Sequence, residues 1–261
     1  MNKKADRVIS KVAPLCLISA ILILWQIASS TGLVPGYMLP SPISVVKALI
    51  NDAPLLADHA KTTLTESFLG LSTAIVMAFV TAGLMDRYLF LEKAVYPLLV
   101  VTQTVPTVAI APLLVLWLGY GIAPKVVLII LTCYFPLTIS LLTGFANADK
   151  DAINLMRAMG ATRWQIFWHI KLKSSMNQFF SGLRVSASYA IVGAVISEWL
   201  GGLGGLGVYM TRVKKSFAFD KMFAVIFLIC FISLALMKLV DLLEKKTMPW
   251  KYLKENGEER Y

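Results

Sequence analysis

Long apolar segments alternate with short polar ones along almost the whole chain. A helix needs about 20 apolar residues to cross a bilayer. Six segments qualify, and they cover roughly residues 12–30, 63–85, 94–118, 125–145, 178–200 and 222–240. The pattern therefore predicts an all-α membrane protein with about six transmembrane helices, arranged as one transmembrane domain over residues 1–261.

The first apolar segment follows a charged N-terminus, as in a secretory signal peptide. Its apolar run, residues 12–28, is longer than the central region of a typical signal peptide. No small-x-small cleavage site follows it. We therefore expect an uncleaved first transmembrane helix.

The third apolar segment carries three prolines and a small polar group. Pro97, Pro106 and Pro112 each remove a backbone donor and kink a helix, and Gln103 and Thr104 lie just before Pro106. Polar groups beside a broken helix often line a transport pathway. They also serve to pack membrane helices together. Both interpretations stay open, with Gln103, Thr104 and Pro106 as candidate pathway residues.

The fifth apolar segment holds Arg184 near one end and Glu198 near the other, with several serines between them, including Ser188. A charge at membrane depth is a functional hypothesis by default. For Arg184 we favour snorkelling towards the interface. For Glu198 a structural and a functional interpretation are equally supported, and Ser188 and Glu198 complete the candidate pathway set.

Composition and charge agree with a membrane protein. Of the 261 residues 57% are hydrophobic and only 15% are charged, against about 25% charged in soluble domains. The net charge of +10 is distributed unevenly: 16 Lys and Arg fall in one alternate set of loops and 7 in the other. The positive-inside rule then predicts that both termini are cytoplasmic. The basic charge therefore does not require a nucleic-acid partner.

Local motifs for metals, disulfides and nucleotides are missing from the sequence. Cys16, Cys133 and Cys230 lie inside apolar runs and are expected to be small buried residues, and the two histidines are far apart. Gly202, Gly204 and Gly207 match GxGxxG, but no strand precedes them, so a tight extracellular turn is the better interpretation. We predict no metal site, no cofactor bound by this chain and no catalytic residue.

The segment after the first span begins with prolines and then turns helical. Ile43, Val46, Leu49 and Ile50 fall on one face at helical spacing. This pattern predicts a short helix lying on the outer membrane surface.

The stretch RAMGATRWQIFWHIKLK, residues 157–173, is a polar and aromatic interruption between two apolar segments. Asp149 or Asp151 can begin a helix, and Gly160 permits the turn that ends it. Thr162 with Gln165 forms a capping box that begins a second helix. A helix–turn–helix with exposed aromatic side chains typically docks into a partner. The alternative is an amphipathic loop resting on lipid headgroups.

The same stretch resembles the cytoplasmic EAA loop of ABC-importer permeases, EAA-x3-G-x9-I-x-L-P. Asn154, Leu155 and Met156 occupy the EAA positions, whereas Gly160, Ile170 and Leu172 match the pattern. Lys173 replaces the final proline. MGATRWQIFWHI is similar to the version in permeases of the nitrate, sulfonate, taurine and pyrimidine-precursor group. LPSP, HAKTTLTESFLG, QTVPTVAIAPLLVLWLGYG and GLGGLGVYM follow the order of that group, so the resemblance covers nearly the whole chain.

This resemblance implies a type I ABC-importer permease in a bacterial cell membrane. Residues 149–175 would form the loop that couples the chain to two copies of a separate ATPase subunit, which binds ATP and Mg²⁺. An extracytoplasmic binding protein would deliver the cargo, and a second copy of this chain would complete the pore. The coupling residues implied are Leu155, Met156, Met159, Gly160, Ala161, Thr162, Arg163, Ile166, Phe167 and Ile170.

Other functions and several cargoes stay open. An ion-coupled secondary transporter would need ionisable groups at mid-membrane. Glu66 and Glu198 are its candidates, although both fall near span ends. Under the ABC interpretation, a thiamine-pyrimidine precursor or another small heterocycle is expected as cargo. An alkylsulfonate, taurine or nitrate is the alternative.

Overall fold

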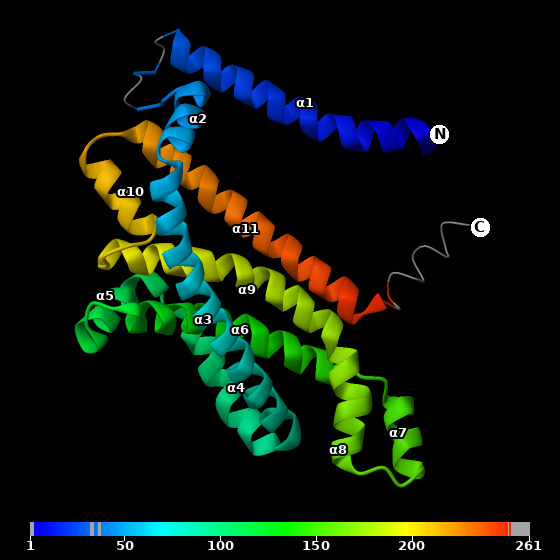
Figure 1. The fold of residues 1–261 in the computed structure, drawn as a ribbon. Helices are drawn as coiled ribbons and strands as arrows, with labels where there is room; N and C mark the ends of the chain where they lie inside the picture. Colours follow the sequence, from blue (N-terminus) through cyan, green and yellow to red (C-terminus); the bar gives the residue numbers. More distant parts are fainter. Residues whose placement is uncertain (1–2, 32–33, 36–37, 250, 252–261) are drawn as a thin grey trace.

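The computed structural model describes residues 3–31, 34–35, 38–249 and 251, and this part of the chain is helical with no strand (Figure 1). The helical elements follow one another along the chain. In chain order they are α1 (Lys3–Ser30), α2 (Pro42–Asn51), α3 (Ala53–Arg87), α4 (Leu89–Thr104), α5 (Thr107–Leu118), α6 (Ile122–Ala146), α7 (Lys150–Ala158), α8 (Arg163–Ile166), the π-helical turn η1 (Phe167–Lys171), α9 (Leu172–Leu200), α10 (Leu206–Lys215) and α11 (Phe219–Thr247).

The number of membrane spans agrees with the sequence. Five helical segments are long and apolar enough to cross a bilayer, and the pair α4 and α5 makes a sixth if it is counted as one span. That pair is bent by 98°. The kink expected at Pro106 is thus a complete break, because Val105 adopts extended dihedrals (φ −84°, ψ 119°), as residues before proline prefer.

The core lies where α3, α6 and α9 pack together. On α3 a small residue recurs every fourth position, at Gly70, Ala74, Ala78 and Ala82. A Cβ at Gly70 would lie 2.5 Å from the Ile129 side chain of α6, so the glycine lets the two backbones approach closely. Small residues at such spacing are the usual basis of helix packing in membranes.

Helix α1 lies apart from the other helices over most of its length (Figure 1). Trp25, near its end, donates to the Pro40 carbonyl at 3.0 Å and stacks on Phe227 of α11. Most described side chains of α1 are exposed and apolar, as expected for lipid contact. Cys16 and Cys230 are also exposed, so the expectation that all three cysteines are buried is correct for Cys133 alone.

The short surface helix expected at residues 43–50 is α2. Ser41 caps it by accepting from the Ser44 backbone N–H at 3.1 Å. Val45 and Ala48 pack on Ala224 of α11. Three of the four residues expected on one face, Ile43, Val46 and Ile50, are exposed, whereas Leu49 is half-buried.

Helices α7 and α8 project at one end of the bundle, and α2 and α10 lie at the other (Figure 1). We call these the α7–α8 end and the α10 end. At the α7–α8 end, Lys171 pairs with Asp86 at 2.6 Å. At the α10 end, Lys221 pairs with Asp52 at 2.8 Å. In each pair, the two residues come from two loops that the charge pattern assigns to the same side of the membrane.

Candidate coupling surface and polar network

Helix α7 begins and ends with local signals. The Asp149 carboxylate caps its start, accepting from the Asp151 backbone N–H at 2.8 Å. At its end Gly160 adopts φ +82°. Gly160 donates to the Arg157 carbonyl at 3.0 Å, and Ala161 donates to Met156 at 2.9 Å. These two bonds form a Schellman motif, in which glycine is favoured because its φ is positive.

Helix α8 begins with the expected capping box. The Gln165 backbone N–H donates to Thr162 Oγ1 at 3.3 Å, and the Thr162 backbone N–H donates to Gln165 Oε1 at 2.8 Å. Two backbone donors at the start of the helix are thereby satisfied. Thr162 and Gly160 together fix a tight turn between α7 and α8.

The hairpin of α7 and α8 has its own small core and an outward apolar face. Ala148, Ile153 and Ile166 are buried together. The side chains of Leu155 and Met159 are 63% and 77% exposed. Trp164 and Trp168 are exposed as well, in edge-to-face contact.

The expected coupling residues therefore fall into two groups. Leu155, Met159 and Arg163 are exposed, and Met156 is half-buried. Ile166, Ala161 and Ile170 instead hold the hairpin together from inside. Phe167 packs inward on Phe145 with 5.3 Å between ring centroids.

The second helix of the hairpin does not end near Lys173. From Arg163 to Leu200 the chain is helical over 38 residues, through α8, η1 and α9. The π-helical turn closes with the Leu172 N–H donating to the Phe167 carbonyl. The fifth span is consequently longer than the expected 178–200, and Lys173 is an exposed residue inside it.

Glu198 lies at the α10 end of α9, where it is buried and hydrogen-bonded. Its carboxylate accepts from Thr63 Oγ1 at 2.7 Å and from the Gly207 backbone N–H at 2.6 Å. Thr63 Oγ1 also accepts from the Leu206 N–H at 2.9 Å. The carboxylate thus ties α3 and the start of α10 to α9.

The glycine-rich segment 201–207 forms the tight turn that the sequence suggested. Gly205 has φ +119°, and a Cβ there would lie 2.2 Å from the Glu198 carboxylate. Its N–H donates to His59 Nδ1 at 3.0 Å. Only a residue without a side chain fits against Glu198 at this point.

A buried ion pair lies beside this network. Lys125 Nζ donates to Glu66 Oε1 at 2.6 Å, and both side chains are almost fully buried. Lys125 is therefore part of α6 packing and not a loop lysine. A buried charge of this kind persists only when it is paired, as here.

Arg184 is paired and does not snorkel as expected. Its guanidinium contacts Asp241 and the buried Glu244, both on α11. Lys251 also pairs with Glu244, at 2.8 Å. These contacts tie α9 to α11, and the buried Glu244 carboxylate is compensated by two cations.

The candidate pathway residues fall at different places. Gln103, Thr104 and Pro106 are exposed at the break between α4 and α5. Thr104 Oγ1 donates to the Val101 carbonyl at 2.8 Å. Ser188 is half-buried on α9, and Glu198 is buried in its own network. The described hydrogen bonds do not join Glu198 to the other four.

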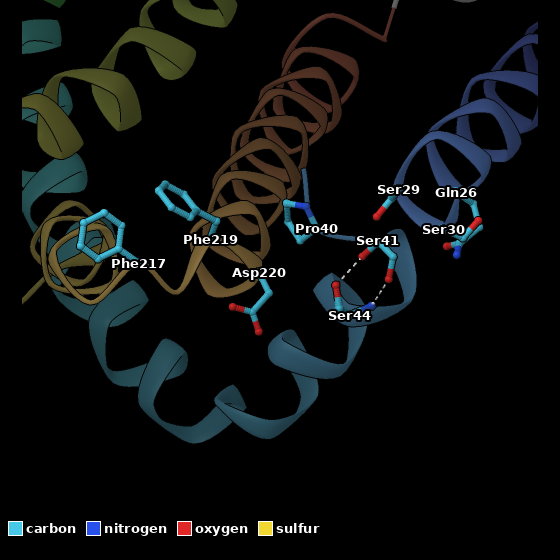
Figure 2. Close-up of a pocket in the computed structure, with 9 residues that line it drawn as sticks. All are labelled: Gln26, Ser29, Ser30, Pro40, Ser41, Ser44, Phe217, Phe219 and Asp220. Carbon is cyan, nitrogen blue, oxygen red and sulfur yellow. Dashed lines mark hydrogen bonds between the residues drawn. The ribbon is translucent and has the colours of Figure 1, made fainter. Parts of the chain in front are cut away.

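The LPSP motif lines a hollow of about 480 Å³ at the α10 end (Figure 2). Ser29 and Ser30 come from α1, Ser41 and Ser44 from the start of α2, and Asp220 from α11. Ser44 Oγ donates to the Ser41 carbonyl at 2.7 Å. Four serines thus line one small space, which the sequence did not indicate, and the hydroxyl group of each bonds a backbone group.

Asp52 joins α2, α10 and α11 at the same end. It accepts from Lys221 and from the Tyr209 hydroxyl. These hydrogen bonds lower the pKa of Asp52 below its usual value, with Lys221 as the larger cause. Burial and the neighbouring Asp52 raise the pKa of Tyr209, so this phenol stays neutral and donates.

Sequence reasoning missed the partners of the buried charges. Lys125 appeared to be one more loop lysine, and Asp241 lies in a polar helix end. Their partners are 57 to 59 positions away along the chain. The one available signal was the presence of unpaired acids, Glu66 and Glu198, in apolar segments.

Comparison with known proteins identifies the family. Residues 70–249 match the model of the binding-protein-dependent transport system inner membrane component. A probable ABC transporter permease protein of Haemophilus influenzae is 35% identical over 87% of this chain and 93% of its own length. The formylaminopyrimidine transport permease protein ThiX of Halalkalibacterium halodurans is 34% identical over 88% of this chain and 92% of its own.

A solved structure has the same fold. A crystal structure of an amino acid ABC transporter with histidines superposes with a TM-score of 0.64. The superposition covers 76% of this chain and 96% of the transporter chain, at 14% sequence identity. The resemblance to ABC-importer permeases drawn from the sequence is confirmed.

Proposed function

The chain belongs to the family of binding-protein-dependent transport system inner membrane components, and we propose that two copies of it form the solute passage of one importer. It is a multi-pass membrane permease subunit of an ABC importer, not an enzyme. Such a permease works with a separate ATPase and a binding protein. The homodimer is supported by the single α7–α8 hairpin in the described part of the chain, since each ATPase copy needs one docking hairpin.

The outward face of the hairpin is the proposed ATPase docking surface. Leu155 and Met159 expose large apolar side chains at the tip of a hairpin held rigid by its own core. Such exposed apolar residues, rimmed by polar ones, mark a protein interface. This geometry is the observation that carries the proposal. Residues 149–175 are then cytoplasmic, as are both termini.

The continuous helix from Arg163 to Leu200 gives the hairpin a direct route to the opposite end. It spans about 55 Å at 1.5 Å per residue. At its far end Glu198 holds the glycine-rich turn through Gly207. A displacement of the hairpin by the ATPase is therefore transmitted along one helix to the α10 end, where cargo enters.

The α4–α5 break is the proposed wall of the passage. Gln103, Thr104 and Pro106 expose polar groups and an interrupted backbone there. Irregular backbone at membrane depth is tolerated where it lines a cavity. Ser188 belongs to the same proposed pathway, and Glu198 sets the geometry of the turn at its α10 end.

We propose a small heterocycle, such as a formylaminopyrimidine, as the cargo. The relative of that name shares 34% of its residues over nearly the full length. The residues at the break are neutral, which fits an uncharged heterocycle better than a small dianion. Uptake of labelled formylaminopyrimidine by cells expressing the importer, with taurine as competitor, tests this. Competition by taurine and not by other pyrimidines would favour the sulfonate alternative.

Site-specific crosslinking tests the docking surface. A photo-crosslinking amino acid at Met159 is expected to capture the ATPase subunit in the assembled importer. The matched control places it at Leu203, which is also exposed and whose carbonyl accepts from Arg212 of α10. Capture of the ATPase from Leu203, or from neither position, would contradict the proposed surface.

A further inference from the structure

A second, larger hollow of about 960 Å³ opens at the α7–α8 end, between the last turns of α3 and the α8–η1 segment. Its volume is in the range of small-molecule sites. Its lining combines two kinds of residue, cations and large apolar side chains. They are Phe79, Val80, Gly83, Leu84, Asp86, Arg87, Arg157, Arg163, Trp164, Ile166, Phe167, Trp168, Lys171 and Leu172.

The hollow carries an excess of positive charge. Four cations line it against one carboxylate, Asp86, and that carboxylate is already paired with Lys171 at 2.6 Å. Arg87, Arg157 and Arg163 form no ion pair within the described residues. Arg157 and Lys171 also line an adjacent hollow that contains Glu92, whereas Arg87 and Arg163 do not line that second hollow. The free charge therefore favours an anion.

The apolar wall continues from the hollow into the membrane. Val80 and Leu84 line the hollow, and Val76 lies one turn further along the same face of α3. Their side chains are 57%, 45% and 63% exposed. A molecule with an anionic head in the hollow thus has an apolar track for its tail, running along a transmembrane helix.

Two local features shape the wall of the hollow. Gly83 lacks a side chain where its Cβ would meet only the Phe167 ring, at 3.7 Å. The π-helical turn at Phe167–Lys171 places Phe167, Trp168 and Lys171 on the wall. Such turns are rare, and they are frequent at functional sites.

We propose that this hollow binds the headgroup of an anionic phospholipid, with one acyl chain lying along Val76, Val80 and Leu84. The phosphate contacts Arg87 and Arg163, and the aromatic rings of Trp164 and Trp168 lie at the headgroup level, where such rings are enriched. The lipid comes from the leaflet at the α7–α8 end. A lipid seated there bridges α3 and the helix that carries the hairpin, so its presence stiffens their junction.

Tryptophan quenching by brominated lipid tests the site directly. The chain is assembled with its ATPase subunits in nanodiscs, with Trp25, Trp117, Trp199 and Trp250 replaced by Phe so that Trp164 and Trp168 report. Brominated phosphatidylglycerol added to a phosphatidylcholine background is expected to quench the tryptophan fluorescence until it reaches a plateau. Brominated phosphatidylcholine at equal fractions is expected to quench weakly and without saturation.

Variants on α3 separate this site from the docking surface. Arg87→Gln is expected to raise the half-saturating fraction of phosphatidylglycerol about fivefold, as one cation near a membrane surface contributes. Gly83→Leu fills the hollow and is expected to abolish saturation, whereas Gly83→Ala is expected to bind as the wild type. Lys173→Gln removes an exposed charge nearby that does not line the hollow, and it is the control for general surface attraction.

The proposal is overturned by any of three results. The first is equal quenching by both lipids. The second is a loss of phosphatidylglycerol binding in Lys173→Gln that is as large as the loss in Arg87→Gln. The third is displacement of the brominated lipid by inorganic phosphate or by soluble cargo at millimolar concentration, which would make the site one for a soluble anion. Arg87 lies on the surface, so Arg87→Gln keeps the test valid even where Gly83→Leu fails to fold.

Discussion

The Glu198 carboxylate holds three parts of the chain at one point. It accepts hydrogen bonds from Thr63 on α3 and from the Gly207 backbone at the start of α10. Gly205 passes so close that a Cβ would overlap the carboxylate. A single side chain therefore sets the shape of the turn at the α10 end.

Replacement of this carboxylate by an amide should separate transport from assembly. In Glu198→Gln one of the two acceptor oxygens becomes an N–H₂ donor, so the bond from either Thr63 or Gly207 is lost. A buried polar group left without its hydrogen bond costs about 1–3 kcal/mol. We expect uptake to fall about tenfold while the amount of assembled importer in the membrane stays unchanged.

The exposed Thr65, two residues from Thr63 on α3, provides the control. Thr65→Val removes a hydroxyl that bonds only its own helix backbone, and uptake should stay normal. Thr63→Val should instead reproduce the loss seen in Glu198→Gln. Normal uptake in both Glu198→Gln and Thr63→Val would leave the network with a packing role only.

Asp52 makes the α10 end sensitive to acid. Its pKa is lowered in the folded protein by hydrogen bonds from Lys221 and Tyr209. A lowered pKa means that the stabilisation is present above the unfolded pKa of about 3.9 and is lost as the pH falls through the folded value. We expect the melting temperature of the wild type to exceed that of Asp52→Asn at pH 6–8.

The same difference should shrink as the pH falls below about 4, since protonated Asp52 then resembles asparagine. Thermal unfolding of the purified importer in detergent, followed at several pH values, measures it. Asp58→Asn is the control, because Asp58 is exposed on α3 and forms no ion pair within the described residues. A wild-type advantage that grows on acidification would contradict the assignment.

At the scale of single elements, the α7–α8 turn depends on one backbone conformation. Gly160 has φ +82°, and nothing lies within 4 Å of a Cβ built there. A substitution therefore costs backbone strain of about 1–2 kcal/mol and no steric clash. Asparagine tolerates this conformation better than other residues.

This geometry orders three substitutions. Gly160→Asn should leave uptake nearly normal, and Gly160→Ala should lower it moderately through loss of the turn. Gly160→Arg should abolish coupling, because it adds a long charged side chain on the docking surface to the same strain. Uptake and cargo-stimulated ATP hydrolysis measured together detect the uncoupling. Equal loss in Gly160→Ala and Gly160→Arg would show that only the strain matters.

Local signals predicted these short elements well. Asp149, Gly160, Thr162 and Gln165 lie within 17 positions of one another, and each acts on the backbone next to it. The junction after Ile166 was not predictable. Lys173 replaces the final proline of the family pattern, and this left open how the second helix ends. The chain continues through a π-helical turn that no residue pattern marks.

At the scale of the whole molecule, the number of spans follows from hydropathy, but their mutual contacts do not. The apolar runs predicted six spans, of which five are single helices and the sixth is the pair α4 and α5, and Pro106 marked the place where that pair is bent. The pairs Glu66–Lys125 and Arg184–Asp241 join residues on different helices, and only the packing of α3, α6, α9 and α11 brings them together. Hydropathy responds to lipid and not to the neighbouring helix, so such pairs leave no periodic signal.

Membrane sidedness is a prediction of the charge pattern that chemical labelling can test. Leu203 lies beside α10 and Met159 ends α7, at opposite ends of the bundle, and the two residues are 98% and 77% exposed. In a chain with its three native cysteines replaced by serine, an impermeant maleimide should label Leu203→Cys in intact spheroplasts. Met159→Cys should be labelled only after permeabilisation. The reverse pattern would place the hairpin outside the cell and exclude it from ATPase contact.

The proposed homodimer requires a second copy of this chain. One hairpin docks on one ATPase copy. Two ATPase copies therefore need two hairpins before their closure can move both halves of the passage. Two differently tagged copies of this chain, co-expressed with the ATPase, should therefore be recovered together after sequential affinity steps. Met159→Arg, which places a charge on the docking surface, should lower ATPase recovery without separating the two tagged copies. Recovery of one tag only, accompanied by a different permease, would show that the passage is a heterodimer in which this chain provides one half.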